Sequence, residues 1–261
     1  CMKSHSESCS CVADIARTAT AFKHQHPDRV LYQSSLMSAL LSGVYEGDTT
    51  MADLLKHGDF GLGTFNHLDG ELIAFNSNIF QLRGDGSARR ALPEQKTPFA
   101  VMTFFNPTNE YVIDRPHSRE QIHAVIDNAV ASQNTFCALR IDGEFSRVET
   151  RTVPEQHRPY KPMLEAIEAQ PTFHIENSQG VLIGFLTPAY MQGINVAGYH
   201  EHFINQTRSS GGHVLDYQVE RGVLTFGTVE KLLIDFPQDS DFLHANLCPD
   251  DLNDAIQSVE S

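Results

Sequence analysis

The sequence predicts an α/β fold of the α+β type with two subdomains, and three observations carry this prediction. Apolar residues recur at helical spacing between about residues 36 and 44. From about residue 59 the pattern changes to the two-residue alternation of half-buried strands. Prolines then punctuate residues 152–172, as in a segment that crosses between two folding units. We therefore expect a tail over 1–30, a mixed sheet with flanking helices over 31–153, and a mainly antiparallel sheet or small barrel over 154–261.

Helices are predicted mainly in the first half of the chain. In LYQSSLMSALLSGVYEG the apolar residues from Leu36 to Val44 lie on one helical face. The run MADLLKHG follows Thr49 and Thr50, and either residue can cap the N-terminus of a helix. Ser118 and Gln121 in SREQIHAVIDNAVAS have the spacing of a capping box. A weaker helical pattern covers residues 12–24, and PDDLNDAIQSVES predicts a last helix.

Strands are predicted between dipeptides that are typical of tight turns. Asp69-Gly70 separates GLGTFNHL from ELIAFNSNIFQL, and Asp142-Gly143 separates TFCALRI from EFSRVETRTV, so each pair predicts a hairpin. PFAVMTFF predicts a buried strand. Later, Gly211-Gly212 and Arg221-Gly222 mark turns between INVAGYHEHFIN, HVLDYQVE and VLTFGTVEKLLIDF, which follow the shorter strands FHIEN and VLIGFLTP.

Composition and charge narrow the classes of function. Asp and Glu number 33 against 19 Lys and Arg, which gives a formal net charge of −14 without any basic stripe. Neither nucleic acid nor an anionic membrane surface is therefore an expected partner. No apolar run approaches the roughly 20 residues that a membrane-spanning helix requires. The negative net charge does not exclude a small anionic substrate, because a metal ion or one Arg can make the local electrostatic potential inside a pocket positive.

The cysteines do not form a disulfide pattern. Cys1, Cys9 and Cys11 crowd the first eleven positions, while Cys137 and Cys248 stand alone, and no CxxC spacing occurs. The opening CMKSHSESCSC lacks the apolar run of a secretory signal. We interpret the thiol pair at Cys9 and Cys11 as part of a mobile tail rather than as a metal site. A cytoplasmic location is expected.

The segment GYHEHFINQTRSSGGHVLDY carries the most specific chemistry. A single histidine is more often a surface or packing residue, but His200 and His202 are two apart in a predicted strand and project from the same face. The Gly-Gly turn returns the chain, so His213 can meet His202 across the hairpin. Three imidazoles leave a tetrahedral ion one open position for water or substrate. Zn²⁺ is the favoured metal, although iron, nickel or manganese accept the same ligands.

Three charged residues have less specific patterns. Glu201 lies between two of the candidate ligands and points to the opposite face, so its role is in solvent or in an outer layer of the site. Glu71 follows a predicted turn, and Arg151 ends a predicted strand, where sites often form. Taken alone, each of these two is more often a surface charge.

Several runs together closely resemble the bacterial α-acetolactate decarboxylase family. The resemblance covers nearly everything from about Leu31 onward, and GDFGLGTFN with GYHEHF and GGH is a highly specific combination. It implies that His200, His202 and His213 are zinc ligands and that the protein is a homodimer. The further runs that carry it are LMSALLSGVYEGDTTMADLLKHGDFGLGTFNHLDGELIAF, KTPFAVMTFF, CALRIDGEF, TRTVP followed by PYKPM, MQGINVAGYHEHFI and GGHVLDYQ.

The same resemblance implies further site residues. Glu71 in LDGEL and Arg151 in TRTVP match the acid and the guanidinium that line the family's site. Glu260 in AIQSVES matches the second active-site carboxylate, and Thr64 in GLGTFN matches a substrate-binding pocket residue.

The implied activity is the zinc-dependent decarboxylation of (S)-2-acetolactate to (R)-acetoin and CO2, in the formation of acetoin and butanediol. In this hypothesis the metal chelates the ketone and hydroxyl oxygens and stabilises the enediolate that remains when CO2 leaves. Arg151 positions the substrate, and Glu71 or Glu260 delivers the proton.

Three other interpretations of the histidine pattern stay open at this point. A cupin-like metal dioxygenase or isomerase expects a Glu a few residues after HxH, where Asn205, Gln206 and Thr207 stand instead. A metal-dependent binding or sensor module would hold acetolactate or a related acid without turnover. A structural zinc expects a fourth protein ligand, often Cys, and none occurs at this spacing.

Overall fold

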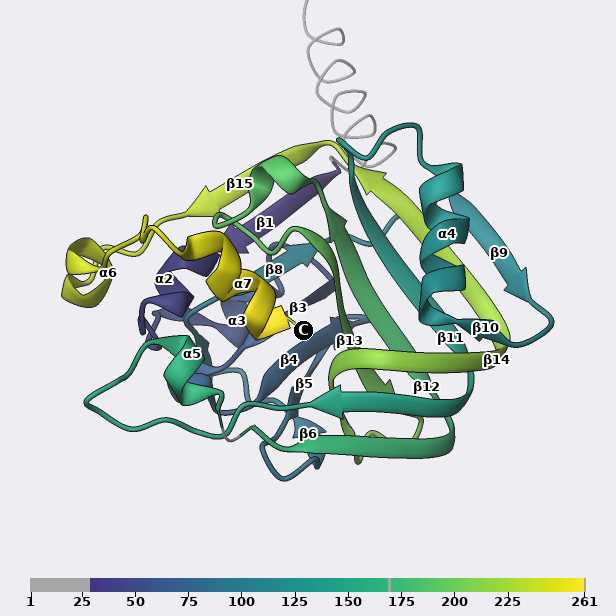
Figure 1. Ribbon diagram of the computed structural model, residues 1–261, viewed down its shortest axis with the longest axis horizontal. Helices are drawn as coiled ribbons and strands as arrows, with labels where there is room; N and C mark the ends of the chain where they lie inside the picture. The colour runs from purple at the N-terminus through teal and green to yellow at the C-terminus, as the bar shows by residue number, and fades with distance from the viewer. Residues whose placement is uncertain (1–28, 169, 261) are drawn as a thin grey trace, which may run out of the picture.

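The structure, a computed structural model, describes residues 29–168 and 170–260, except the side chain of Glu260. The tail cysteines and the helix predicted over residues 12–24 lie outside this part. The predicted fold class is confirmed: the chain is mostly β, with an N-terminal mixed sheet, a C-terminal antiparallel sheet that nearly closes into a barrel, and a few short helices (Figure 1).

The first sheet has seven strands within the described residues, in the order β15-β1-β8-β3-β4-β5-β6. Neighbours pair antiparallel, except β1 and β15, which run parallel and make the sheet mixed. A strand from late in the chain therefore forms one edge of this sheet. The bounds are β1 Val30–Ser34, β3 Phe60–Thr64, β4 Glu71–Phe75, β5 Asn78–Leu82, β6 Ala88–Arg90, β8 Ala100–Thr103 and β15 Lys231–Asp235.

The second sheet is built on long strands that close on themselves. β14 pairs with β11, β11 with β12, β12 with β13, and β13 returns to β14, while β9 and β10 add to β14. A small two-stranded ladder, β2 with β7, stands apart. The bounds are β9 Asn109–Ile113, β10 His117–Ser118, β11 Phe136–Arg151, β12 Thr172–Thr187, β13 Gly198–Asn205, β14 Gly211–Val229, β2 Thr49–Thr50 and β7 Lys96–Thr97.

The subdomain boundary at residue 154 stays a prediction, because the sheets exchange strands across it. β9, β10 and β11 precede this residue and belong to the second sheet, whereas β15 follows it and belongs to the first. The two sheets are therefore interleaved along the chain, and each half of the sequence contributes to both.

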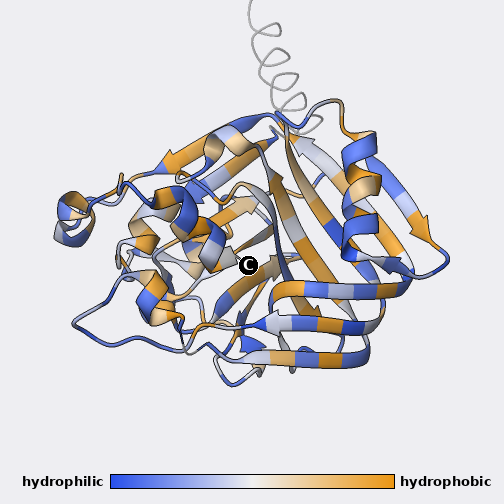
Figure 2. Ribbon diagram, viewed as in Figure 1, coloured by the Kyte–Doolittle hydropathy of each residue, from blue (hydrophilic) through white to orange (hydrophobic). Residues whose placement is uncertain are grey.

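The helices are short and lie around the sheets (Figure 1). The predicted capping box of α4 is confirmed: the Ser118 hydroxyl accepts from the Gln121 backbone N–H, and the Gln121 side chain accepts from the Ser118 backbone N–H. Figure 2 shows alternating hydrophilic and hydrophobic residues along α4, whose Ile122 and Ile126 are fully buried.

No described helix is long and apolar enough to cross a membrane. The bounds are α2 Met37–Leu41, α3 Met51–Leu54, α4 Arg119–Ala129, α5 Met163–Ala166, α6 Ser240–His244 and α7 Leu252–Glu260, with 3-10 turns at Asn66–Leu68 and Ala189–Met191.

The first predicted hairpin lies at a different turn. Asp69-Gly70 was expected to join two strands directly, but the 3-10 turn Asn66–Leu68 stands between β3 and β4, so this prediction is wrong. The two-residue turn is Asn76-Ser77, inside what the sequence predicted as one strand. Both residues have positive φ, 51° and 57°. This is the left-handed geometry that matches the twist of a tight hairpin.

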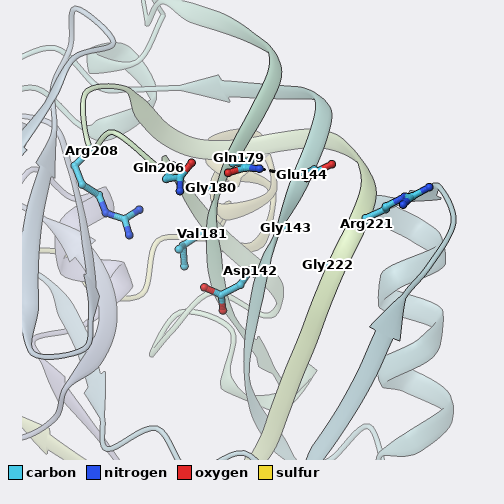
Figure 3. Close-up of a pocket in the computed structure, with 10 residues that line it drawn as sticks. All are labelled: Asp142, Gly143, Glu144, Gln179, Gly180, Val181, Gln206, Arg208, Arg221 and Gly222. Atoms are coloured by element: carbon cyan, nitrogen blue, oxygen red, sulfur yellow. Dashed lines mark hydrogen bonds between the residues drawn. The ribbon is translucent and has the colours of Figure 1, made fainter.

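Three other predicted strand breaks are also wrong, and they share one physical cause. Gly143, Gly180 and Gly222 lie side by side in the middle of continuous β11, β12 and β14, with Gly143 paired to both of the others (Figure 3). A Cβ added to Gly143 would lie 2.6 Å from the Arg221 carbonyl oxygen. This glycine row lets the backbones approach closely where the long strands cross a surface pocket, so it marks close packing and not turns.

Replacing Gly143 with Ala tests this interpretation. The new methyl would meet backbone that cannot move aside, so we expect the free energy of unfolding to fall by about 1–3 kcal/mol. Urea unfolding followed by circular dichroism gives the value. Glu176→Ala, at an exposed position of β12, is the control and should stay within about 0.5 kcal/mol of the parent. Equal stability of the two variants would contradict the close-packing role.

Candidate metal centre

Three histidines meet where β13 turns back into β14. β13 carries His200 and His202, β14 carries His213, and His202 is the direct cross-strand partner of His213. One ring nitrogen of each residue lies within 4.8 Å of the others, and they form a group suited to hold a metal ion. The structure thus brings together all three residues that the sequence selected as candidate ligands, by the hairpin geometry that the sequence predicted.

His202 is the most constrained of the three. Its side chain is fully buried, and its Nδ1–H donates to the Leu72 carbonyl oxygen of β4 at 2.7 Å. In a neutral imidazole this bond leaves the lone pair on Nε2. Among the described residues this buried Nε2 has no hydrogen-bond partner. A buried acceptor without a donor is costly, and a cation bound there would satisfy it.

Burial keeps His202 and His213 uncharged. Burial lowers the pKa of His202 well below its ordinary value, and the neighbouring His200 lowers it further. Burial also lowers the pKa of His213, and the charge of Arg151 adds to this effect. Neutral imidazoles are the form that binds metal, so no proton has to leave these two rings near neutral pH.

The first sheet supplies the facing wall of the site. Thr64 on β3 and Glu71 on β4 are direct cross-strand partners and are buried. The Glu71 carboxylate oxygen Oε2 lies 3.8 Å from Nε2 of His202. The Thr64 hydroxyl donates to the Gly70 carbonyl oxygen at 2.8 Å, which fixes its orientation and leaves its oxygen as an acceptor.

Arg151 ends β11 directly opposite His213, and only 3% of its surface is exposed. Its Nη1 donates to Oε1 of Gln170 at 2.9 Å, and its Nη2 donates to the Val259 carbonyl oxygen on α7. Its buried Nε has no hydrogen-bond partner among the described residues. Two of the five N–H donors of this guanidinium therefore hold it in place, and the Nε–H is among those left over.

A small cavity joins the predicted residues. Thr64, Glu71, Arg151, His200 and His213 all line it. The last turn of α7 closes it through Val259, which packs into the main core with Ala255 and Ile256. Its apolar lining residues are Met37, Leu40, Leu68, Phe99, Val153, Met163 and Val259.

One predicted residue of this site cannot be placed, and two residues that support the site were not predicted from the sequence. Glu260 is the last residue of α7, but its side chain lies outside the described residues, so its placement stays a prediction. Gln170, which holds Arg151, and the Leu72 carbonyl, which orients His202, were not predicted. No local signal marks either one, because both act through contacts between distant segments.

The fold and the site define a class: a mostly β protein with a three-histidine candidate metal centre where its two sheets meet. The family model described as "Alpha-acetolactate decarboxylase" matches residues 31–249. The chain is 62% identical over 260 residues to the alpha-acetolactate decarboxylase of Klebsiella aerogenes, with both chains fully covered. The crystal structure of alpha-acetolactate decarboxylase from Bacillus subtilis strain 168 superposes on this chain with a TM-score of 0.87. The two chains are 45% identical, and the match covers 89% of this chain and 99% of the other.

The chain therefore belongs to the alpha-acetolactate decarboxylase family. A second relative, from Raoultella terrigena, is 59% identical over 257 residues and covers 98% of this chain and 99% of the relative. The resemblance seen in the sequence is confirmed, and so is the prediction that the protein is a lyase of this kind. The dioxygenase and sensor interpretations lose their support.

The buried histidines predict a pH-dependent stability of the metal-free protein. The folded-state pKa values of His202 and His213 lie below the ordinary value of about 6.5, so below that pH the unfolded chain binds more protons. We expect the free energy of unfolding to fall with decreasing pH, with a slope that approaches about 1.4 kcal/mol per pH unit for each histidine only as the pH falls below about 6. Urea unfolding of chelator-treated protein between about pH 7 and pH 5.5 measures this slope.

The variant His213→Gln serves as the control, because Gln does not titrate. Its slope should be shallower than that of the parent by the share of one histidine. A parent protein whose unfolding free energy is constant over this range would show that the imidazoles are not held in the neutral form.

Proposed function

We propose that His200, His202 and His213 hold a zinc ion and that the protein converts (S)-2-acetolactate to (R)-acetoin and CO2. The single observation that carries the metal is the grouping of three imidazoles around a buried His202 whose Nε2 has no hydrogen-bond partner among the described residues. The relatives named above support the substrate. A homodimer and a cytoplasmic location belong to the same proposal and rest on the family resemblance and on the composition.

The donor set fits a catalytic zinc better than a structural one. Among the described residues the group contains three histidines and no fourth ligand from Cys. Cys137 is buried and Cys248 is exposed, and neither belongs to the group. Three nitrogen ligands leave a zinc ion an open position, and a cavity lies against His200 and His213. When bound, the ion supplies a Lewis acid at the place where negative charge develops as CO2 leaves.

Arg151 binds and orients the anionic substrate in this proposal. Its guanidinium stays charged at ordinary pH, and Gln170 and α7 hold it in place. The Nε–H is a donor that remains for substrate oxygen. Because the donor is already fixed and buried, it stabilises developing charge without reorganising. Arg151 is thus a group for binding and charge stabilisation, and it is a poor general acid.

Glu71 or Glu260 holds the proton that replaces the lost carboxylate. Glu71 is the member of this pair whose side chain is described, and it faces the histidines from the opposite sheet. A proton donor fixed on one wall delivers to one face of the carbon, which sets the configuration of acetoin. Thr64 accepts a hydrogen bond from the substrate hydroxyl, and the apolar lining excludes water around the methyl groups.

Metal removal tests the reaction and the cofactor together. Purified protein should release acetoin from racemic acetolactate, lose at least about 100-fold of this rate after chelation, and regain it with zinc. Circular dichroism before and after chelation checks that the fold persists. A folded, zinc-loaded protein that yields no acetoin would contradict the proposal and favour a binding module.

Substitutions in the cavity test the assigned roles. Arg151→Gln should lower kcat/KM by about 10²–10³-fold with zinc content unchanged, since it removes a charge that acts on the substrate. Arg147→Gln is the matched control, because Arg147 lies on the same strand in an exposed ion pair with Asp216.

The proton-transfer role needs a second readout. Glu71→Gln or Glu260→Gln should lower the rate by about 10²–10⁴-fold or reduce the enantiomeric purity of the acetoin, as chiral chromatography measures. If both variants keep the parent rate and purity, neither carboxyl supplies the proton.

A further inference from the structure

Behind the three histidines lies a buried group of charges that the proposed reaction does not use. Residues 200 and 202 of β13 face the candidate metal centre, so Glu201 between them faces the other side, as the sequence predicted. There its side chain is fully buried under α4. Its Oε2 accepts from Nε of Arg119 at 2.7 Å, and its Oε1 lies 3.1 Å from Nε2 of His123.

Arg119 connects both strands that carry the histidines. In addition to its bond to Glu201 on β13, its Nη1 donates to the Leu215 carbonyl oxygen on β14 at 3.1 Å. Leu215 is two residues from His213, and Glu201 is adjacent to His200 and His202. One rigid guanidinium therefore spans the two strands at the level of the metal centre, from the side opposite the cavity.

A second contact aligns the same stretch of β13 with α4. The Tyr199 ring stacks on His123 with centroids 3.6 Å apart, and its hydroxyl donates to Oδ1 of Asp127 at 2.7 Å. Tyr199 and Glu201 thus bind the helix, while the alternating residues His200 and His202 face the candidate metal centre. Rotation of this strand about its axis would break the contacts with α4 and turn both imidazoles away from their common point.

Burial of this carboxylate requires a glycine on the neighbouring strand and costs desolvation free energy. Gly184 on β12 is paired with Glu201, and a Cβ there would lie 2.7 Å from Cγ of Glu201. Apolar side chains would pack the same space without the desolvation of two charges. What the ion pair adds, and apolar packing lacks, is a fixed direction and distance between β13, α4 and β14.

We propose that Arg119 and Glu201 are positioning residues that clamp β13 to β14 and thereby set the spacing of the three histidine ligands. The inference rests on the proposed metal role of these histidines. The clamp acts through the backbone and touches neither the metal nor the substrate. Loosening it widens the range of positions that the imidazoles sample, so the site holds its ion less tightly and with a less regular geometry.

The test measures metal binding rather than turnover. The variants are Glu201→Gln, which removes the buried charge, and Arg119→Lys, which keeps a charge but replaces the two separate nitrogens that reach the two strands with a single nitrogen. Zinc affinity is measured by competition with a chelator, and the visible absorption of the cobalt-loaded protein reports ligand geometry. Ile126→Val is the control, because it weakens α4 packing at a buried position without touching the clamp.

We expect the zinc Kd to rise about 10–100-fold in Glu201→Gln and about 10-fold in Arg119→Lys, with altered cobalt bands in both. Ile126→Val should keep the parent Kd and spectrum. Should Glu201→Gln fail to fold, Arg119→Lys decides alone. Parent-like affinity and spectrum in the folded variants, or equal changes in Ile126→Val, would overturn the clamp. A parent protein that binds neither zinc nor cobalt would instead overturn the metal centre and the clamp with it.

Discussion

The hydrogen bond from Nδ1 of His202 to the Leu72 carbonyl is the contact on which the rest of the site depends. It joins the second sheet to the first at a fully buried point, 2.7 Å between donor and acceptor. It fixes which nitrogen of the ring carries the proton, and so it leaves Nε2 as the nitrogen that can bind a metal ion in the three-histidine group. It also brings β4, with Glu71, against the histidine wall.

Because the site lies between two interleaved sheets, it needs nearly the whole chain. Thr64 and Glu71 come from the first sheet, Arg151 and the histidines come from the second, and α7 closes the cavity from the end of the chain. β15 completes the first sheet only after the second has been traversed. The carbonyl of Val259 then accepts from Arg151, so the last helix is bonded to the site that it covers. The cavity is therefore assembled by long-range contacts, and both polar and apolar side chains line it.

Electrostatics on the two faces of β13 work in opposite directions. On the cavity face burial holds His202 and His213 neutral, and Arg151 disfavours their protonation as well. On the other face burial alone would raise the pKa of Glu201, but His123 and Arg119 lower it below its ordinary value, so the carboxylate stays charged. The strand thus holds uncharged metal-binding groups on one face and a buried ion pair on the other, because successive side chains of a strand point to opposite faces.

The sequence by itself determined the features that depend on neighbours in the chain. These are the β-rich character, the capping box of α4, the shared face of His200 and His202, and the return of His213 through the Gly-Gly turn. It did not distinguish a turn from a close crossing, since Asn76-Ser77 makes the tight turn while Gly143 stands in a continuous strand. Glycine is suited to a tight turn and also to a closely packed strand. The sequence near it therefore does not show which of the two it forms. The tertiary structure brought Thr64, Glu71 and Arg151 to one cavity with His200 and His213, and Gln170 to Arg151, because strand pairing and packing join segments that are distant in the chain.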